Sequence, residues 1–305
     1  IGTAEKPIIF TDANDQIVYA NGTTSPNRSV TDKGLWGSVI ILGNGIVGAA
    51  SGEANIEGVV SGYEFTKYGG SNNAENSGTL KYVSIRHTGT AVSPGNELQG
   101  LTMGGVGSGT VIENIELIGS EDDGIEIFGG AVNVTNIVIA NFDDDGIDLD
   151  QAYDGTISNA VVIMAPGSDT VFEIDGTEEP NNAIVGEYTI KNVTAYGRSD
   201  AAKFDTFGNW KSDATGFNEN VLFVDFPAST TLGGIDSDTY DGAGTAPIEG
   251  KLNFKDFIVV TSDSKATVVG GQVDEASATW ISVSTTRPSS KGANESVFSW
   301  TQFFN

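Results

Sequence analysis

An acidic phrase occurs twice in this chain at a separation of 22 residues. DDGIEI spans positions 122–127 and DDGIDL spans 144–149, so that Asp123 and Asp145 open equivalent strands. A fixed period of about 20 to 50 residues indicates stacked repeats, because one repeat alone cannot bury its apolar face. The sequence therefore predicts a repeat architecture.

A second set of short strands keeps step with this phrase. Each strand has the pattern apolar-x-Asn/Asp-apolar-x-apolar, and the strands recur at steps of 22, 23, 33, 28 and 36 residues. Strands stacked about 4.8 Å apart would bury one core and align these side chains into a ladder of hydrogen bonds. Parallel strands connected by crossovers without helices predict an all-β fold, the right-handed parallel β-helix. A leucine-rich repeat has a similar period, but its regular Leu pattern is missing here. The ladder positions are Asn114, Asn136, Asn159, Asn192, Asn220 and Asp256.

We expect the whole chain of 305 residues to form a single β-helix domain. Residues 1–110 would hold the N-terminal turns, including the phrase IEGVVSGYEFTKYGG at 56–70, and residues 111–260 the regular central turns. The segment 233–246 has no strand pattern and is expected to be an inserted acidic loop. Residues 261–305 would cap the open end of the coil. The aromatic residues of this cap are Trp280, Phe298, Trp300, Phe303 and Phe304.

The charge balance limits the possible partners. The 41 acidic residues outnumber the 15 basic ones, and the formal net charge of −26 repels nucleic acid and anionic membranes and attracts cations. The same charge also keeps an exposed protein soluble. No run of 18 apolar residues occurs, so we expect no membrane insertion of this segment. The absence of cysteine excludes thiolate metal sites, and the single histidine, His87, excludes His-rich ones.

The repeated phrase predicts a column of carboxylates on the outside of the solenoid. Alternation places Ile125 inside the coil and Glu126 outside it, and Asp148 follows Glu126 one turn later. We expect Lys203 next in the column, with Glu173 displaced by one residue. Like charges about 5 Å apart repel unless neutralised, and Ca²⁺ prefers oxygen ligands. The predicted Ca²⁺ ligands are Asp122, Asp123, Glu126, Asp143, Asp144, Asp145, Asp148 and Asp150.

The Asp-Gly pairs have a second interpretation. Aspartates before glycine are common turn formers, and their side chains cap backbone N–H groups. Both roles can hold at once, and the sequence does not separate them.

Several aromatic residues lie near one another in sequence. We interpret Tyr196, Phe207 and Trp210 as candidate ligand-binding residues, because exposed rings on a flat β-helix face can stack on sugars. Ordinary packing of inserted loops is the alternative.

Six phrases carry a family resemblance: GTAEKPIIFT (2–11), GLWGSVIILGN (34–44), SGTLKYVSIRHTG (77–89), GNELQGLTMGGVGSGTVIENIEL (95–117), DDGIEIFGG (122–130) and GANESVFSWTQF (292–303). They resemble β-helix proteins of Bacteroidota that have the pectate-lyase-like fold and mostly no assigned activity. The resemblance implies a secreted protein or one on the bacterial cell surface. The chain opens as if within a structural unit, so we expect a processed protein whose targeting segment lies outside it.

Enzymes of the same fold suggest a catalytic alternative. Pectate-lyase-like proteins typically use Ca²⁺ and a Lys or Arg base, which would make Lys203 the base and Arg198 an auxiliary cation. Polygalacturonase-like proteins hydrolyse with clustered aspartates, but the Gly-His-Gly and Arg-Ile-Lys segments of that pattern are missing here.

We therefore expect a non-catalytic extracellular or cell-surface module, structural, adhesive or glycan-binding, that is stabilised by Ca²⁺. Its partners would be polysaccharide or other cell-surface components, and its ligand and oligomeric state stay open. The alternative is a Ca²⁺-dependent lyase or hydrolase of acidic polysaccharide.

Overall fold

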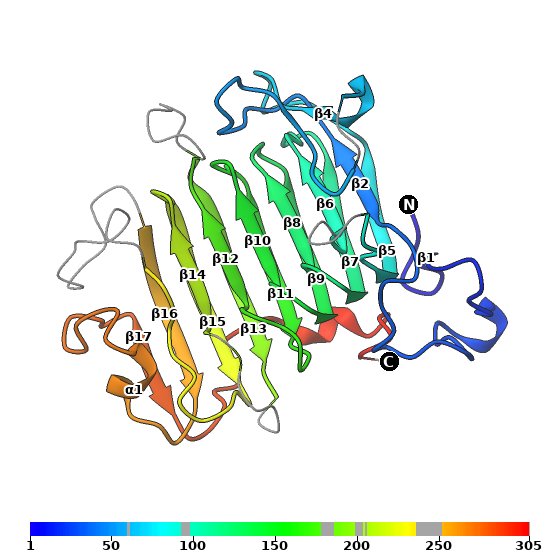
Figure 1. Cartoon of the computed structure of the whole chain (residues 1–305). Helices are drawn as coiled ribbons and strands as arrows, with labels where there is room; N and C mark the ends of the chain where they lie inside the picture. The colour runs from blue at the N-terminus through cyan, green and yellow to red at the C-terminus, as the bar shows by residue number, and fades with distance from the viewer. Residues whose placement is uncertain are drawn as a thin grey trace.

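The chain winds into a right-handed parallel β-helix whose strands lie side by side (Figure 1). The computed structural model describes residues 1–59, 62–92, 98–177, 186–198, 204, 206–235 and 252–304. Successive coils stack along one axis, so the fold predicted from the repeat is confirmed.

Sheet A runs the length of the solenoid and contains nine strands within the described residues. Each strand pairs in register with the equivalent strand of the next coil, and all of these pairings are parallel. Its strands are β1 (Ile8–Phe10), β5 (Thr79–Thr88), β7 (Val111–Ser120), β9 (Asn133–Phe142), β11 (Thr156–Ile163), β13 (Tyr188–Tyr196), β15 (Gly216–Val224), β16 (Leu252–Val260) and β17 (Ile281–Ser284).

Sheet B consists of shorter strands that alternate with those of sheet A along the chain. Between β5 and β15 the polypeptide passes from one sheet to the other in every coil, and the apolar side chains facing inward form one continuous core. Ile125 and Ile127 in one coil and Ile147 and Leu149 in the next are fully buried in this core, as the alternation predicted. In the described residues the strands of sheet B are β2 (Val39–Leu42), β6 (Leu101–Gly104), β8 (Ile125–Phe128), β10 (Ile147–Asp150), β12 (Phe172–Asp175) and β14 (Gly208–Lys211).

The predicted ladder positions bend the long strands of sheet A. All six have φ between 55° and 59°, the left-handed region that asparagine and aspartate tolerate better than other side chains. Asn136 Nδ2 donates to Asn114 Oδ1 at 3.1 Å, and Asn159 Nδ2 donates to Asn136 Oδ1 at 2.7 Å. The amide ladder is therefore confirmed here, and the left-handed backbone explains why these residue types recur.

Asn136→Ala is expected to lower the free energy of unfolding by about 1–3 kcal/mol, because alanine resists the left-handed backbone and removes two ladder hydrogen bonds. Asn136→Gly is the matched control, since glycine adopts this backbone freely and loses only the side chain. Chemical denaturation should rank the wild type above the glycine variant and the glycine variant above the alanine variant. A glycine variant less stable than the alanine variant would contradict the role of the backbone.

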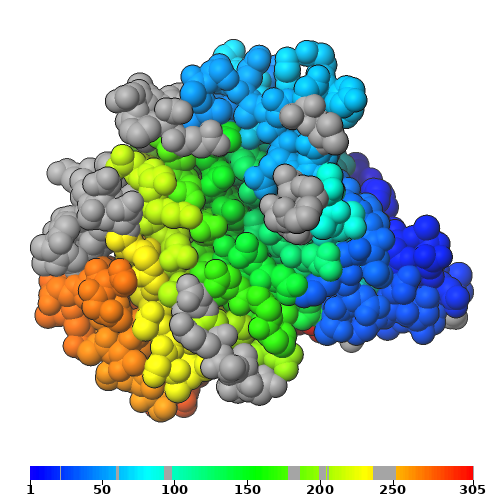
Figure 2. Space-filling model, in the orientation of Figure 1, coloured from blue at the N-terminus to red at the C-terminus, as the bar shows by residue number. Residues whose placement is uncertain are grey.

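Two insertions interrupt the N-terminal coils. Residues 43–78 follow β2 and contain an antiparallel hairpin of β3 (Ala54–Asn55) and β4 (Lys67–Tyr68), so the phrase at 56–70 is not the coil turn that the sequence suggested. Figure 2 shows this insertion as the light-blue projection at the top and residues 11–34 as the dark-blue projection at the right. The first 110 residues therefore contain two insertions as well as the N-terminal turns that the sequence predicted.

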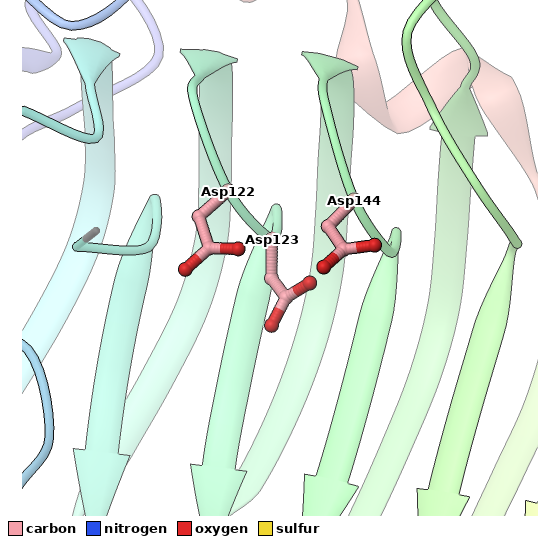
Figure 3. A group of neighbouring side chains, drawn as sticks. All are labelled: Asp122, Asp123 and Asp144. Carbon is pink, nitrogen blue, oxygen red and sulfur yellow. The ribbon is translucent and has the colours of Figure 1, made fainter. Parts of the chain in front are cut away.

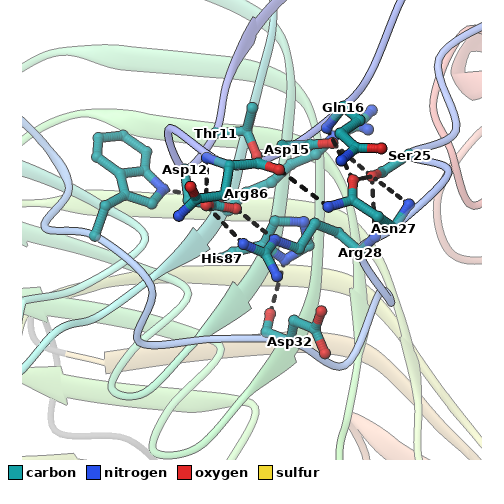
Figure 4. A network of polar contacts seen from close by, with 12 residues as sticks. Thr11, Asp12, Asp15, Gln16, Ser25, Asn27, Arg28, Asp32, Arg86 and His87 are labelled. Atoms are coloured by element: carbon teal, nitrogen blue, oxygen red, sulfur yellow. Dashed lines mark hydrogen bonds and ion pairs between the residues drawn. The ribbon is translucent and has the colours of Figure 1, made fainter.

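The N-terminal insertion is a polar loop that lies against the end of β5 (Figure 4). Arg28 binds Asp12 through two hydrogen bonds of 2.6 and 2.7 Å. The carbonyl oxygen of Asp32 lies 2.8 Å from His87 Nδ1, and the buried Arg86 donates to the carbonyl oxygen of Thr23 at 2.6 Å. These contacts fix the loop to sheet A.

The C-terminal region caps the last coil with only part of the predicted aromatic set. Trp280 stacks on Phe254 with ring centroids 4.5 Å apart and planes 22° apart, and it meets Phe257 edge-on. The short helix α1 (Lys265–Val269) buries Val268 and Val269 in the same core. The cap prediction is thus confirmed for Trp280.

The other aromatic residues of the predicted cap belong to a segment that returns along the solenoid. After β17 the chain, red in Figure 1, runs back toward the N-terminal end. Phe298 packs on Val138 and Val161, which face away from the core, and Trp300 meets the ring of Tyr82 at 5.5 Å. Covering these valines removes apolar surface from water. The prediction that Phe298, Trp300, Phe303 and Phe304 close the open end is therefore wrong.

Most of the predicted loop at 233–246 lies outside the described residues. Its first part is attached to the solenoid, because Ile235 bridges to Trp210. Within the described parts of the chain, no helix has the length and apolar character needed to cross a membrane.

Candidate cation site on sheet B

The repeated acidic phrase forms the turns through which the chain enters β8 and β10. Asp122 and Asp123 precede β8, and Asp144 occupies the equivalent turn one coil later (Figure 3). Glycine follows each aspartate pair because the coils approach closely: a Cβ on Gly124 would lie 2.7 Å from the carbonyl oxygen of Gly146. This close approach stacks the acidic turns on one another.

Two aspartates of these turns cap backbone groups of the next coil. The N–H of Asp145 donates to Asp123 Oδ1 at 2.9 Å, and the N–H of Thr170 donates to Asp145 Oδ1 at 2.8 Å. The Thr170 hydroxyl donates to the same oxygen of Asp145. Asp123 and Asp145 therefore do act as turn formers, which was one of the two interpretations of the phrase.

The expected displacement of Glu173 assumed that Asp169 is the equivalent of Asp123 and Asp145 in the next coil, and the structure differs from this alignment by one residue. The N–H of Asp169 donates to the carbonyl oxygen of Asp144 at 2.7 Å, and Thr170 rather than Asp169 follows Asp145. The error arose because Asp169 is the nearest acidic residue at this spacing, whereas the residue whose N–H Asp145 caps is a threonine.

This shift changes the predicted acidic column. Glu126, Asp148 and Glu173 stand in register on β8, β10 and β12, and Asn209 of β14 follows them. The expectation that Glu173 leaves the column is therefore wrong. Lys203, which was expected in its place, lies outside the described residues.

Glu126 and Asp148 differ from Glu173 because they have no cationic partner among the described residues. Lys211 Nζ donates to Glu173 Oε1 at 2.6 Å, whereas Glu126 and Asp148 make no ion pair in the described part of the chain. They are only 4% and 7% exposed, and Glu126 Oε2 and Asp148 Oδ1 have no hydrogen-bond partner among the described residues. Together with Asp123 they form the carboxylate trio, whose ligand oxygens lie within 4.8 Å of one another. Burying three such carboxylates together destabilises the folded state unless they share a proton or a cation.

Burial raises the pKa of all three members of the trio well above their ordinary values. Negative neighbours add to the effect, chiefly Asp122 for Asp123, and Asp123 for both Glu126 and Asp148. Burial also raises the pKa of Asp145 to about 8. Without a cation, these carboxyl groups hold their protons to a higher pH than ordinary carboxyl groups do.

Two further acidic groups flank the trio. Asp122, Asp123 and Asp144 converge in one of them, drawn in Figure 3, and Asp144, Asp145 and Asp169 converge in the other. Neither Asp144 nor Asp169 is buried, so these groups are more open to water than the trio. Sequence reasoning missed Asp169 as a member, although its position within the repeat was a usable signal.

The last two predicted ligands have other surroundings. Asp143 forms an ion pair with Lys33 of the N-terminal insertion. Asp150 ends β10 and lines a separate hollow with Asp175. Neither belongs to a cation-sized group of acidic side chains within the described residues.

One acidic residue near the site gave no signal in the sequence. Gln99 Nε2 donates to Glu57 Oε1 at 2.9 Å and to Asp122 Oδ2 at 3.4 Å, so it links the insertion at 43–78 to the acidic turns. Burial raises the pKa of Glu57. Because this insertion lies outside the repeat, periodicity could not have placed Glu57 here.

The predicted ligand-binding aromatic residues separate into two kinds. Phe207 and Trp210 are 1% and 0% exposed and belong to the core, where Trp210 meets Phe254 edge-on at 5.0 Å. Neither ring can stack on a sugar, so that prediction is wrong for both, and ordinary packing is the correct interpretation. Tyr196 is half-buried at the surface.

The structure describes one of the two residues of the catalytic alternative. Arg198 is half-buried and follows the end of β13 in sheet A. Lys203 lies outside the described residues, so the structure does not place the proposed base.

A family model described as a pectate-lyase-like β-helix domain matches residues 1–305 of the chain. No curated protein and no solved structure matches it. The match covers every coil, both N-terminal insertions and the returning C-terminal segment.

Proposed function

We propose, since this chain belongs to the family of pectate-lyase-like β-helix domains, that it is a non-catalytic, polysaccharide-associated module stabilised by Ca²⁺. The family supports a general relation to polysaccharides. The resemblance to surface and secreted proteins of Bacteroidota favours a position outside the cell or on its surface, with polysaccharide or other surface components as partners.

The carboxylate trio is the observation that supports a bound cation. Glu126 Oε2 and Asp148 Oδ1 are buried without a hydrogen-bond partner among the described residues, and they converge with a carboxylate oxygen of Asp123. A divalent cation would satisfy both oxygens and relieve the repulsion between the coils. Ca²⁺ suits this set because every donor is a hard oxygen and no thiolate or imidazole belongs to the group.

Burial of the trio favours a structural role for this ion over a catalytic one. The three side chains are each less than a tenth exposed, so a polymer in solution has little access to an ion held among them. Its effect would be to join β8 and β10, the central strands of sheet B. The proposed ion therefore fastens one coil to the next.

Thermal unfolding of the wild-type chain in EDTA and in millimolar Ca²⁺ tests the proposal. We expect Ca²⁺ to raise the melting temperature, because an ion that binds only the folded state stabilises it by mass action. The same preparation should release no unsaturated uronate from pectate or alginate, as followed by ultraviolet absorbance. An unchanged melting temperature would refute the stabilisation by Ca²⁺. An increase in absorbance from unsaturated uronate would identify a lyase.

The metal-free protein should lose stability as the pH rises. The pKa of Asp145 is about 8 in the folded state and 3.8 in its ordinary state, so protonation favours folding. Its contribution is complete below the ordinary pKa and is lost as the pH rises through the folded value. We expect the EDTA-treated protein to melt at a higher temperature at about pH 5 than at about pH 8, and Ca²⁺ to stabilise it more at the higher pH. The opposite order in EDTA would contradict the raised pKa.

A further inference from the structure

A hollow opens where three consecutive coils leave sheet A. Tyr196, Val224 and Val260 are the last residues of β13, β15 and β16, and they stand in register along the solenoid. The turns that follow β15 and β16 complete the walls, and the hollow has a volume of about 520 Å³. This volume lies within the range of small-molecule sites, about 300–1,000 Å³.

Aromatic and polar groups share the walls of this hollow. Phe226 joins Tyr196 there, and Asp225, Thr261 and Ser262 add a carboxylate and two hydroxyl groups. The Asp225 carboxylate makes no hydrogen bond or ion pair with the described residues, so it is available to a ligand. The wall that the structure describes contains no lysine, arginine or histidine. An anionic ligand would therefore meet the Asp225 carboxylate and no cationic side chain in this wall.

Tyr196 is held in place by the returning C-terminal segment. Its hydroxyl donates to Glu295 Oε1 at 2.6 Å, and the guanidinium carbon of Arg287 lies 5.4 Å from its ring centroid. Burial, reinforced by the hydrogen bond to Glu295, raises the pKa of Tyr196 to about 12, so the phenol stays protonated. A ring fixed before binding loses little conformational freedom when a ligand stacks on it.

Phe226 is also held in place by its neighbours, which are three phenylalanine rings. Its ring packs against Phe207, Phe223 and Phe204 at centroid distances of 5.0, 5.8 and 5.6 Å. A Cβ on Gly197 would lie 2.6 Å from the ring, so glycine is needed there for the coil to approach it. The two aromatic residues thus form a rigid pair on adjoining coils.

We infer that this hollow binds a neutral glycan, with a sugar ring stacked on Tyr196 and Phe226 and its hydroxyl groups bonded to Asp225 and Thr261. Sugars combine apolar C–H faces with polar edges, which matches aromatic rings beside the Asp225 carboxylate and two hydroxyl groups. Coils repeat about every 4.8 Å along the solenoid, close to the length of one sugar unit in an extended chain, so consecutive units can follow consecutive coils. The inference rests on the proposed function and names where a polysaccharide-associated module holds its ligand.

Isothermal titration calorimetry of the full chain with cellohexaose, xylohexaose and mannohexaose tests this inference. The wild type should bind at least one of these neutral glycans and should bind trigalacturonate more weakly. Tyr196→Ala should weaken binding of that neutral glycan by about tenfold, the range expected when an aromatic stacking surface is lost. Phe217→Ala is the matched control, because Phe217 is 52% exposed on β15 and does not line the hollow. Tyr196→Phe keeps the ring and should retain more binding than Tyr196→Ala.

The outcomes separate this inference from the proposed function. Wild-type binding that Tyr196→Ala leaves unchanged would overturn the hollow as the site and leave a polysaccharide-associated module intact. Preference for trigalacturonate would overturn the neutral ligand, and binding of no glycan would overturn both this inference and the polysaccharide role. Melting curves of the same proteins with and without Ca²⁺ verify that each variant folds and test the ion independently.

Discussion

Replacing Glu126 with glutamine and Asp148 with asparagine together should abolish stabilisation by Ca²⁺ and raise the melting temperature of the EDTA-treated protein. The amides replace two buried acidic groups that repel each other when ionised, and they can donate hydrogen bonds to the neighbouring oxygens, so the metal-free fold should gain about 1–3 kcal/mol. Ca²⁺ should lose its effect because only the Asp123 carboxylate is left in the trio. Melting curves of the variant in EDTA and in Ca²⁺ measure both changes.

Glu275→Gln is the control for this pair of substitutions, because Glu275 is exposed and does not belong to any of the acidic groups in the described residues. It removes a negative charge without touching the trio and should respond to Ca²⁺ as the wild type does. A double variant that keeps the full Ca²⁺ response would move the ion to another group. A double variant less stable than the wild type in EDTA would show that the charges themselves stabilise the turn.

Glu116→Ala is expected to lower the free energy of unfolding by about 3–5 kcal/mol, because it leaves the buried guanidinium of Arg86 without its countercharge. Arg86 Nη2 lies 3.1 Å from Glu116 Oε2, and both side chains are fully buried. Glu116 Oε1 also accepts a hydrogen bond of 2.5 Å from the N–H of Gln302. One ion pair thus holds both the N-terminal loop, through Thr23, and the returning C-terminal segment. Denaturant unfolding measures the loss.

The double variant Arg86→Met with Glu116→Leu separates charge from packing. It removes both charges together and keeps apolar volume, so it should be far more stable than Glu116→Ala. If both variants lost the same stability, the contacts of the two terminal segments, rather than the unpaired charge, would determine the cost. Val111→Ala on the exposed part of β7 provides a reference for an ordinary surface change.

The fold could be predicted from the sequence because its repeating constraint is local. Each coil needs a residue that accepts a left-handed backbone at the same point of the strand, and asparagine marks that point from Asn114 to Asn220. Spacing alone then locates the strands of sheet A. The returning C-terminal segment has no such marker, since Phe298 is placed by Val138 and Val161, which are far from it in sequence.

The candidate site could be predicted in part for a related reason. The acidic phrase identified Asp123, Glu126 and Asp148, and alternation placed the last two outside the core. Their burial could not be read from the sequence, because an outward-facing side chain is buried only by segments that cross over it. The alignment of the following coil was displaced because Thr170, not an aspartate, occupies the position whose N–H Asp145 caps, and Asp169 lies one residue before it.

The most direct test is an anomalous difference map from crystals of the EDTA-stripped protein soaked in Ca²⁺. The structure predicts one strong peak among Asp123, Glu126 and Asp148, with carboxylate oxygens about 2.3–2.6 Å from the ion. The same map from the Glu126→Gln, Asp148→Asn variant should show no peak at this position. An empty trio in the wild-type crystals at saturating Ca²⁺ would contradict the ion, and protons alone would then neutralise these carboxyl groups.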